Sequence, residues 1–559
     1  MSIALLLFEK GLIDRGQLDR AVEEERSTGE RLEKILLRHG AVSRGQVLEA
    51  MAEQFHMTVV DLDAAEVDRD VLALLPAKIV TRQMCVPIAR RNGTLTVATS
   101  DPAGLFELDE LRLLTGCTID VVLADEEELA GFIRAHYGVG SDTLEQMAAG
   151  KESVAVATES RDADVDQAQE ASVIKLVNDL LGEAIVERAT DVHIEPYEHD
   201  LVVRYRIDGV LQRANVPPTI TRFGNAIVSR LKIMASMNIA EKRKPQDGRI
   251  TIRHRVDGRL QEFDLRVSII PMLFGEGVVL RVLSKSAVLL RLEDLGMPGS
   301  MLGRWDGMIN RPHGILLVTG PTGSGKSTTL YSSLNRIVSD EVKVITVEDP
   351  VEYHVPGVNQ IQVNPKVGLT FSAGLRSVLR HDPDVVMIGE IRDAETAETA
   401  VQASLTGHLV FSTLHTNDAA GATTRLLDMG VEPFLVASSV EGVLAQRLVR
   451  RICRHCAQPY APDAADLPAE FTLPEGGALM KGAGCRECRN TGYRGRVGLF
   501  ELFAMSDAAR ELVMNRKNAH EIAAKSIADG DLTLLKHDGF EKVAKGATTM
   551  TEVMRALTA

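Results

Sequence analysis

A single octapeptide limits the possible folds of this chain more than any other part of the sequence. Residues 320–327 read Gly-Pro-Thr-Gly-Ser-Gly-Lys-Ser, after the apolar run Ile315–Val318 and before a segment with a helical pattern. Glycines at this spacing let backbone N–H groups converge on phosphate oxygens at a helix N-terminus. We expect Lys326 to reach the β- and γ-phosphates and Ser327 to ligate Mg²⁺. The expected phosphate-binding residues are Gly320, Pro321, Thr322, Gly323, Ser324, Gly325, Lys326, Ser327 and Thr328.

Length and charge narrow the class of protein. A chain of 559 residues is too long for one core, and 45% hydrophobic residues are enough to build several. A formal charge of −15 argues against nucleic acid as the main partner. The opening run Ile3–Phe8 is too short for a membrane span or a secretory core. We therefore expect a cytoplasmic, multidomain protein, in which paired cysteines suggest metal before disulfide.

The first two segments are small. Residues 1–56 contain a repeat in which a helix, a glycine stop at Gly11 or Gly40 and a second helix follow one another. This pattern predicts an N-terminal helical repeat domain, and small helical pairs of this kind usually make docking domains. Strand-like and helical segments then alternate over 57–137, which predicts a small α/β docking domain.

The middle of the chain changes composition twice. Residues 138–171 are rich in Ala, Ser, Glu, Asp and Gln and poor in large apolar groups, so we expect a flexible linker. Alternating segments around one helix predict an α+β domain over 172–286. The nucleotide-binding domain is expected over 287–559.

Four apolar runs in this last domain end at polar residues. Continuous apolar strands that alternate with helices indicate a parallel sheet, and such sheets bind ligands beyond the carboxyl ends of their strands. The fold class expected is α/β, with the four strand ends in one crevice. The runs and their ends are Ile315–Thr319 before the phosphate loop, Val342–Val347 before Glu348, Val385–Ile388 before Gly389 and Glu390, and Leu409–Leu414 before His415.

These ends supply the groups that phosphoryl transfer to water needs. The reaction requires a metal, a group that orients the water, and positive charge around the γ-phosphate. We expect Glu390 to hold Mg²⁺ through water or to polarise the nucleophile, Glu348 to be the general base, and His415 to hydrogen-bond the γ-phosphate. For each side chain taken alone, a solvated carboxylate or a satisfied loop histidine is the alternative.

Four cysteines form a second pattern. Cys453, Cys456, Cys485 and Cys488 make two C-x-x-C knuckles separated by 28 residues, a spacing suited to a tetrahedral Zn²⁺ site. Four thiolates leave no position for water, so we expect a structural metal in an insertion over 450–495. Arginines crowd the knuckles, and they either offset the site's negative charge or contact anionic lipid or an acidic partner. These arginines are Arg451, Arg454, Arg486, Arg489, Arg494 and Arg496.

Longer motifs carry a resemblance to a known family from about Asp191 to the C-terminus. They resemble the Walker A, Asp box, Walker B and His box of the type II/type IV secretion ATPase superfamily, and within it the type II secretion ATPases called general secretion pathway protein E. The cysteine knuckles favour this branch over the pilus retraction and conjugation ATPases, which usually lack them. Pilus extension ATPases remain close, and the segment Gln360–Gly368 looks more like secretion than pilus assembly. The motifs are Asp191–Pro196, Pro245–Arg249, Gly320–Ser327, Val347–Tyr353, Asp382–Asp393 and Thr406–Asn417.

The resemblance implies an architecture and a function. It implies a RecA-like ATPase domain preceded by a PAS-like α+β domain, assembled as a homohexamer that binds ATP between the two halves of its core. Arginines from the smaller domain match Arg266 and Arg281, while Arg376, Arg380 and Arg392 lie within the ATPase domain. A guanidinium offers permanent positive charge to a phosphate whose charge grows during cleavage.

The implied activity is ATP hydrolysis at the cytoplasmic side of the inner membrane that powers pseudopilus assembly and protein export. The N-terminal domains would dock on the cytoplasmic part of an inner-membrane platform protein. A type IV pilus assembly ATPase and a non-hydrolysing nucleotide switch are the alternatives, and a motor acting on nucleic acid is the least favoured.

The N-terminal repeats also resemble the paired helical motif that binds cyclic di-GMP in some relatives. Here Glu33 follows Arg31 and Leu32 where a glycine is expected, and the first copy has no Arg-Leu-Gly. A side chain at that position stands where backbone should approach the guanine and phosphate. We therefore expect protein docking rather than dinucleotide binding.

Overall fold

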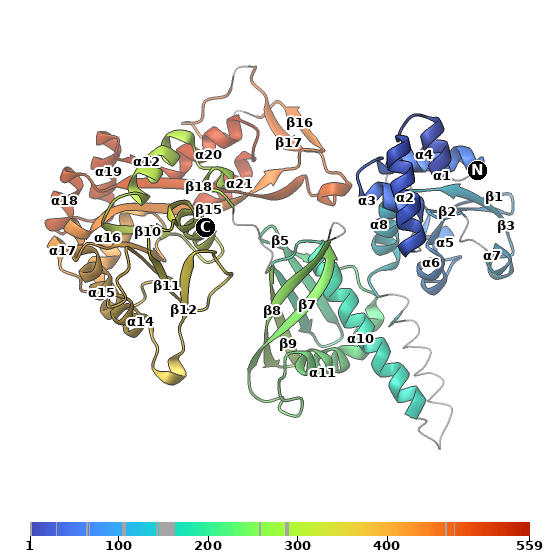
Figure 1. The fold of residues 1–559 in the computed structure, drawn as a ribbon, viewed down its shortest axis with the longest axis horizontal. Coiled ribbons are helices and arrows are strands. Elements are labelled where there is room, and N and C mark those ends of the chain that lie inside the picture. Colours follow the sequence, from blue (N-terminus) through green and yellow to red (C-terminus); the bar gives the residue numbers. More distant parts are fainter. Residues whose placement is uncertain are drawn as a thin grey trace. The chain divides into compact units, whose positions relative to one another are not determined.

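The computed structural model describes most of the chain, and Figure 1 shows its helices and strands. The described residues divide into two compact units, Met1–Ser284 and Lys285–Ala559. The domain limits expected within them remain predictions. The residues described are 3–28, 31–62, 65, 67–102, 108–140, 143–144, 163–256, 259–284, 290–463, 465, 467–474 and 476–558.

The first unit begins with four helices around a small core. Gly11 and Gly40 follow the first helix of each repeat with φ of 70° and 66°, a conformation that glycine adopts without strain. The last helix begins with a capping box in which Ser43 and Gln46 each bond the other's backbone N–H. The helices are α1 (Ile3–Glu9), α2 (Arg15–Thr28), α3 (Leu32–Arg38) and α4 (Arg44–Phe55).

A three-stranded sheet with four short helices follows. Its central strand β2 (Thr94–Thr99) pairs antiparallel with β1 (Cys85–Arg91) and parallel with β3 (Thr118–Leu123). Before these strands, Val59 forms a single parallel bridge with Leu123. The helices are α5 (Arg69–Leu72), α6 (Ala77–Gln83), α7 (Leu108–Thr115) and α8 (Glu126–Tyr137).

Most of the segment expected to be a linker, 138–171, lies outside the described residues. At its two ends the structure differs from the expectation. Val139 and Leu144 are buried in the core of the following α+β fold, because their apolar side chains pack there. The helix α10 (Ala163–Val186) covers the last nine residues of the expected linker.

The rest of the first unit is a six-stranded antiparallel sheet packed against helices. Its strand order is β6-β5-β4-β9-β8-β7, and α10 and α11 (Gly224–Met234) bury their apolar side chains against it. Long strands with alternating burial present one polar face, which carries the arginines of interest. The strands are β4 (Asp191–Pro196), β5 (Leu201–Ile207), β6 (Val210–Arg213), β7 (Gln246–Val256), β8 (Arg259–Met272) and β9 (Gly275–Ser284).

The second unit is built on an eight-stranded sheet of order β12-β11-β13-β14-β10-β15-β18-β19 (Figure 1). Neighbouring strands from β12 to β15 are parallel, and β18 and β19 add antiparallel pairs. The largely parallel sheet agrees with the expected α/β class. The strands are β10 (Gly314–Thr319), β11 (Val344–Glu348), β12 (Val358–Gln362), β13 (Val385–Ile388), β14 (Leu409–Leu414), β15 (Val440–Ile452), β18 (Tyr493–Ala504) and β19 (Leu532–Thr533).

Both faces of this sheet are covered by helices. Along β10, Ile315 and Leu317 belong to one core and Leu316 and Val318 to another, so a continuous apolar run is needed to satisfy both faces. The first core is covered by α14 (Phe371–Val378), α15 (Ala394–Leu405), α16 (Ala419–Asp428) and α17 (Pro433–Ser439), and the second by η2 (Leu292–Leu295), α12 (Gly299–Ile309) and α13 (Lys326–Ile337).

The C-terminal helices pack against β15, β18 and β19 at one side of the sheet. Glu552, which is 1% exposed, accepts hydrogen bonds from the Arg450 backbone N–H, the Arg450 side chain and Arg555. Burial alone raises the pKa of Glu552, but the bonds from Arg555 and Arg450 outweigh it and lower the pKa to about 2. These bonds fasten the last helix to β15. The helices are α18 (Asp507–Met514), α19 (Ala519–Asp529), α20 (Leu535–Ala544) and α21 (Met550–Thr558).

Candidate nucleotide and metal sites

The phosphate-binding loop lies between β10 and α13, as the sequence predicts. Gly320, Gly323 and Gly325 have φ of 146°, 80° and 91°, which side chains rarely allow. A Cβ on Gly320 would lie 2.4 Å from the carbonyl oxygen of Gln446, so glycine is also required by space. The loop therefore has the backbone freedom and the helix N-terminus that phosphate binding needs.

Lys326 is held inside this loop. Its side chain is 9% exposed, and its Nζ donates to the carbonyl oxygens of Gly320 at 2.8 Å and Pro321 at 3.0 Å. Burial lowers the pKa of Lys326 to about 8, while the charge of Glu390 raises it and that of Arg447 lowers it. The lysine, Glu390 and Arg447 are thus close enough to interact electrostatically.

The ends of β13 and β14 bring Glu390 and His415 together. Their strands pair in register, with Ile388 opposite Ser412, and His415 Nε2 lies 3.4 Å from Glu390 Oε2. Arg392 forms an ion pair with the same carboxylate. Carboxylate, imidazole and guanidinium groups therefore meet at the strand ends that the sequence singled out.

The end of β14 is in turn tied to the end of β10. The Thr319 hydroxyl, just before the phosphate loop, lies 2.7 Å from the Thr416 hydroxyl and accepts the Thr416 N–H at 2.9 Å. These bonds hold the segment after His415 next to the residue that precedes the loop. Lys326, Glu390 and His415 lie along one edge of the sheet, as the order of the strands predicts.

Glu348 is placed differently from the other strand-end residues. It is 4% exposed, and its carboxylate accepts hydrogen bonds from Tyr331, from Thr346 at 2.5 Å and from Gln360 at 3.1 Å. Burial, and then the Glu348 charge, raise the pKa of Tyr331, which keeps that hydroxyl a donor. Both carboxylate oxygens are therefore engaged, so Glu348 must exchange at least one partner before it can take a proton from water.

The groups expected to hold Mg²⁺ fit a hard cation. Ser327 lies in the first turn of α13 with its side chain exposed, and the Glu390 side chain is 17% exposed. A hydroxyl and a carboxylate are oxygen ligands of the kind that Mg²⁺ accepts, usually together with phosphate oxygens and water.

Arg376 and Arg380, expected to bind ATP, lie at the surface. Arg376 forms an ion pair with Glu395, and Arg380 donates to the carbonyl oxygen of Arg376 at 2.7 Å and to Ser377. None of these partners belongs to the phosphate loop, so within one chain these contacts of Arg376 and Arg380 are local.

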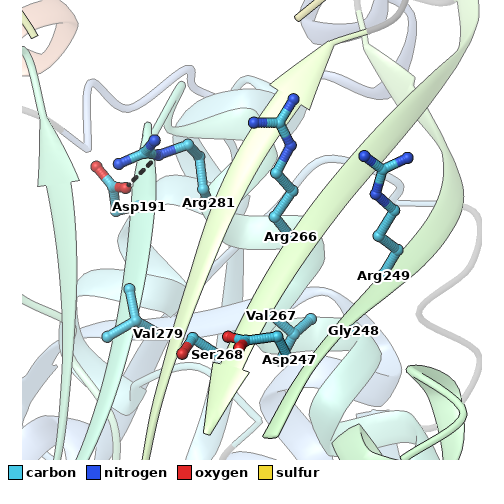
Figure 2. Close-up of a pocket in the computed structure, with 9 residues that line it drawn as sticks. All are labelled: Asp191, Asp247, Gly248, Arg249, Arg266, Val267, Ser268, Val279 and Arg281. Atoms are coloured by element: carbon cyan, nitrogen blue, oxygen red, sulfur yellow. Dashed lines mark hydrogen bonds and ion pairs between the residues drawn. The ribbon is translucent and has the colours of Figure 1, made fainter. Parts of the chain in front are cut away.

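A row of arginines crosses the polar face of the six-stranded sheet in the first unit. Arg249, Arg266 and Arg281 are directly opposite one another on β7, β8 and β9, and Asp191 follows on β4. They line a cavity of about 500 Å³, and Figure 2 shows the three guanidinium groups side by side. Arg281 Nε lies 3.4 Å from Asp191 Oδ1.

This row includes a residue that sequence reasoning did not single out. Arg266 and Arg281 were expected, whereas Arg249 was noted only as part of a motif. Like charges directly opposite across a sheet repel, so three arginines in one row favour an anionic ligand. The position of Arg249 in the row depends on the register between β7 and β8, which the sequence alone does not determine.

The four cysteines come together as a metal centre requires. Their Sγ atoms all lie within 4.8 Å of one another, and Cys453–Cys485 and Cys456–Cys488 are each separated by 3.7 Å. A tetrahedron with metal–sulfur distances of about 2.3 Å has edges of roughly 3.8 Å, so the set fits Zn²⁺. Cys488 Sγ also accepts the N–H groups of Cys485 and Gly492.

The centre joins the two ends of an excursion from the main sheet. Cys453 follows β15 and Cys488 precedes β18, and between them β16 (Ala457–Tyr460) pairs with β17 (Leu479–Gly482). Among the described residues this is the one cluster with metal-ligand geometry.

Across the same described ranges, no helix has the length and apolar character of a membrane span.

Two known protein families match parts of this chain. Residues 166–555 match the family described as Type II/IV secretion system protein, and residues 55–143 match the MshEN domain. The chain is 42% identical over 562 residues to the type IV pilus assembly ATPase PilB of Myxococcus xanthus, covering 98% of this chain and 97% of that protein.

Two further relatives are type II secretion system proteins E. The one from Xanthomonas campestris is 41% identical over 558 residues, covering 98% of this chain and 97% of the relative, and the one from Pseudomonas aeruginosa is 52% identical over 394 residues, covering 70% and 76%. Among solved structures, the ATPase DotB of Yersinia pseudotuberculosis is similar in fold, with a TM-score of 0.51 at 21% identity over 70% of this chain and 94% of that one.

Proposed function

This chain belongs to the Type II/IV secretion system protein family, and from that membership we propose that it is a motor that hydrolyses ATP to power protein export by a type II secretion system. The observation that carries the proposal is the meeting of Lys326, Glu390 and His415 at the end of one parallel sheet. Such an arrangement supplies positive charge, a metal ligand and a hydrogen-bond donor around a transferring phosphate.

The roles proposed for the residues follow their positions. Lys326 binds the β- and γ-phosphates, Ser327 and Glu390 hold Mg²⁺, and His415 contacts the γ-phosphate. Glu348 acts as general base after exchanging a partner within its buried hydrogen-bond network.

The arginines complete the site in an assembly. In a homohexamer of RecA-like domains, each with a PAS-like neighbour, Arg266 and Arg281 would reach bound ATP, and the geometry of the row adds Arg249. Arg376 and Arg380 would give up their local partners to contact phosphate. Fixed guanidinium charge is suited to the growing charge of the transition state.

A type IV pilus assembly ATPase is the second candidate. The PilB relative covers as much of this chain as the Xanthomonas protein E, at nearly equal identity. The segment Gln360–Gly368 favours secretion, and the structure gives Gln360 a hydrogen bond to Glu348. Both candidates use the same ATP site, so they differ in the platform protein that the ring acts on.

The N-terminal domains are proposed to dock on that platform protein at the cytoplasmic face of the inner membrane. In the repeat that resembles a dinucleotide motif, the Arg31 guanidinium lies 2.9 Å from Asp101, and the Glu33 side chain is only 16% exposed. The arginine is already paired and a carboxylate occupies the position of the expected glycine, which disfavours an anionic dinucleotide. Arginines around the cysteine centre, such as Arg454, would add contact with anionic lipid.

Affinity capture distinguishes the two platforms. The full-length chain, used as bait in detergent extracts of its own cells, should recover a secretion-platform protein, and a chain lacking residues 1–137 should not. Recovery of a pilus-platform protein instead would favour the second candidate.

Titration of the full chain with cyclic di-GMP should give no binding heat, and saturable heat would overturn the docking assignment in favour of a dinucleotide site.

The low pKa of Lys326 predicts that nucleotide binding weakens in alkaline solution. Phosphates bind the charged lysine, and the free chain loses this proton as the pH rises through about 8. The affinity for a fluorescent ADP analogue should fall about tenfold between pH 7 and pH 9. Lys326→Arg, which stays charged, should bind with little dependence on pH in this range, and a pH-independent wild type would contradict the prediction.

A further inference from the structure

A second buried cation, Arg447 on β15, lies beside the phosphate loop. β15 pairs in parallel with β10 and places Ala445 opposite Thr319, so Gln446 and Arg447 continue next to Gly320. The Arg447 side chain is 7% exposed. Its Nη1 would lie 3.3 Å from a Cβ built on Gly320, so the absence of a side chain lets the guanidinium approach the loop backbone.

Only one of the three nitrogens of this guanidinium is satisfied. Nη2 donates to the backbone oxygen of Asn417 at 3.2 Å and to its side-chain oxygen at 3.3 Å. Nε and Nη1 are buried and have no hydrogen-bond partner among the described residues. Ser324 Oγ, which would lie 2.7 Å from the same Cβ position on Gly320, is also buried and unpartnered within the described structure. Buried polar atoms normally have partners, so these atoms point to a ligand-dependent arrangement.

The charges around Arg447 do not supply a close carboxylate. Glu501 and Asp418 attract it, but Glu501 accepts the N–H groups of Ala419 and Leu535, and Asp418 accepts that of Gly421. Lys326, the other buried cation of the loop, repels it. Two buried cations that converge on one glycine, with no carboxylate ion-paired to Arg447 in the described part of the chain, favour an anion at this place.

We propose that Arg447 is a positioning residue for nucleotide binding, which stabilises the phosphate-bound form of the loop and ties it to Asn417, two residues after His415. The inference rests on the proposed function. When Lys326 turns to the phosphates, the carbonyl oxygens of Gly320 and Pro321 lose their donor. The unpartnered Nη1 is a buried donor beside Gly320 that can take up this role, while Nη2 keeps the segment after β14 in register with the loop.

This arrangement predicts opposite effects on binding and on stability. A buried guanidinium with unsatisfied nitrogens lowers the stability of the nucleotide-free fold, because its charge is only partly compensated. Arg447→Met keeps the length of the side chain and removes the charge. It should weaken binding of a fluorescent ADP analogue to the full-length chain by about tenfold or more, without lowering the Tm of the nucleotide-free protein.

Two companion variants separate positioning from a general structural role. Arg447→Lys, which restores charge but not the fork of nitrogens, should recover part of the affinity. Lys525→Met, an exposed cation on α19, should bind like the wild type. Affinity within twofold of the wild type in Arg447→Met would overturn the inference, and so would a loss of affinity accompanied by a clearly lower Tm.

The wild type itself separates this inference from the proposed function. If the wild-type chain bound no nucleotide while its Tm and zinc content were normal, the proposed function would fail and the inference with it. If the wild type bound and Lys326→Ala did not, unchanged binding by Arg447→Met would remove only the role given to Arg447.

Discussion

Replacing Glu390 with glutamine should lower the rate of ATP hydrolysis on the order of a thousandfold while nucleotide binding at pH 7 persists. Glutamine has nearly the same shape, but it is a weaker Mg²⁺ ligand and cannot polarise water as a carboxylate does. The neighbouring His415, 3.4 Å away, and the ion-paired Arg392 lose their shared anion in the same change. The variant should therefore bind nucleotide but hydrolyse ATP slowly.

The choice of pH matters for this measurement. The charge of Glu390 raises the pKa of Lys326, so its removal lowers that pKa below about 8. The lysine of the variant holds its proton better at pH 7 than at pH 8.5, where a loss of binding would be confused with a loss of chemistry. Phosphate release and binding of a fluorescent ADP analogue should both be measured at the lower pH.

Two further variants bracket the result. Lys326→Ala should lose both binding and turnover, because the buried cation that meets the phosphates is gone. Glu398→Gln changes an exposed carboxylate on α15, away from the strand ends, and should hydrolyse ATP like the wild type. More than half of the wild-type turnover in Glu390→Gln would remove Glu390 from the mechanism.

The placement of Glu390 and His415 could be predicted because it depends on a local pattern. Each residue follows a short apolar run, and parallel strands end at a common edge, so the sequence is sufficient to bring them near the phosphate loop. The same reasoning placed Glu348 at this edge. It could not predict that Tyr331, Thr346 and Gln360 occupy the carboxylate, because those contacts depend on side chains from a helix and a neighbouring strand.

Arg249 and Arg447 were missed for a related reason. Arg249 becomes part of a row only through the pairing of β7 with β8 and of β8 with β9. Both pairings are hairpins whose register the sequence leaves open. Arg447 lies within a mostly apolar strand that is buried along most of its length. The residue pattern of such a strand does not show that the Arg447 side chain is only 7% exposed. A Gln-Arg pair inside such a run was the available signal, since charged residues are rarely buried without a function.

Loss of the metal centre should have the largest effect on stability. Purified protein should contain one zinc per chain, and Cys453→Ser should contain none, because a hydroxyl cannot replace a thiolate in a four-sulfur site. Structural zinc contributes roughly 10–16 kcal/mol in small peptides. Here the long pairing of β15 with β18 retains part of the excursion's structure, so we expect a loss on the order of 5 kcal/mol.

The loss should also be local, which hydrogen exchange can resolve. Amides from Cys453 to Gly492 should exchange faster in Cys453→Ser, since β16 and β17 form only a two-stranded sheet that is marginal without the metal. Amides of β10 should keep their protection because both of its faces are buried by other elements. ATP hydrolysis should accordingly fall much less than in Glu390→Gln. Cys117→Ala, a buried cysteine in the first unit, should retain its zinc. A metal-free wild type, or equal protection of the excursion in Cys453→Ser, would show that the four thiols hold no structural ion.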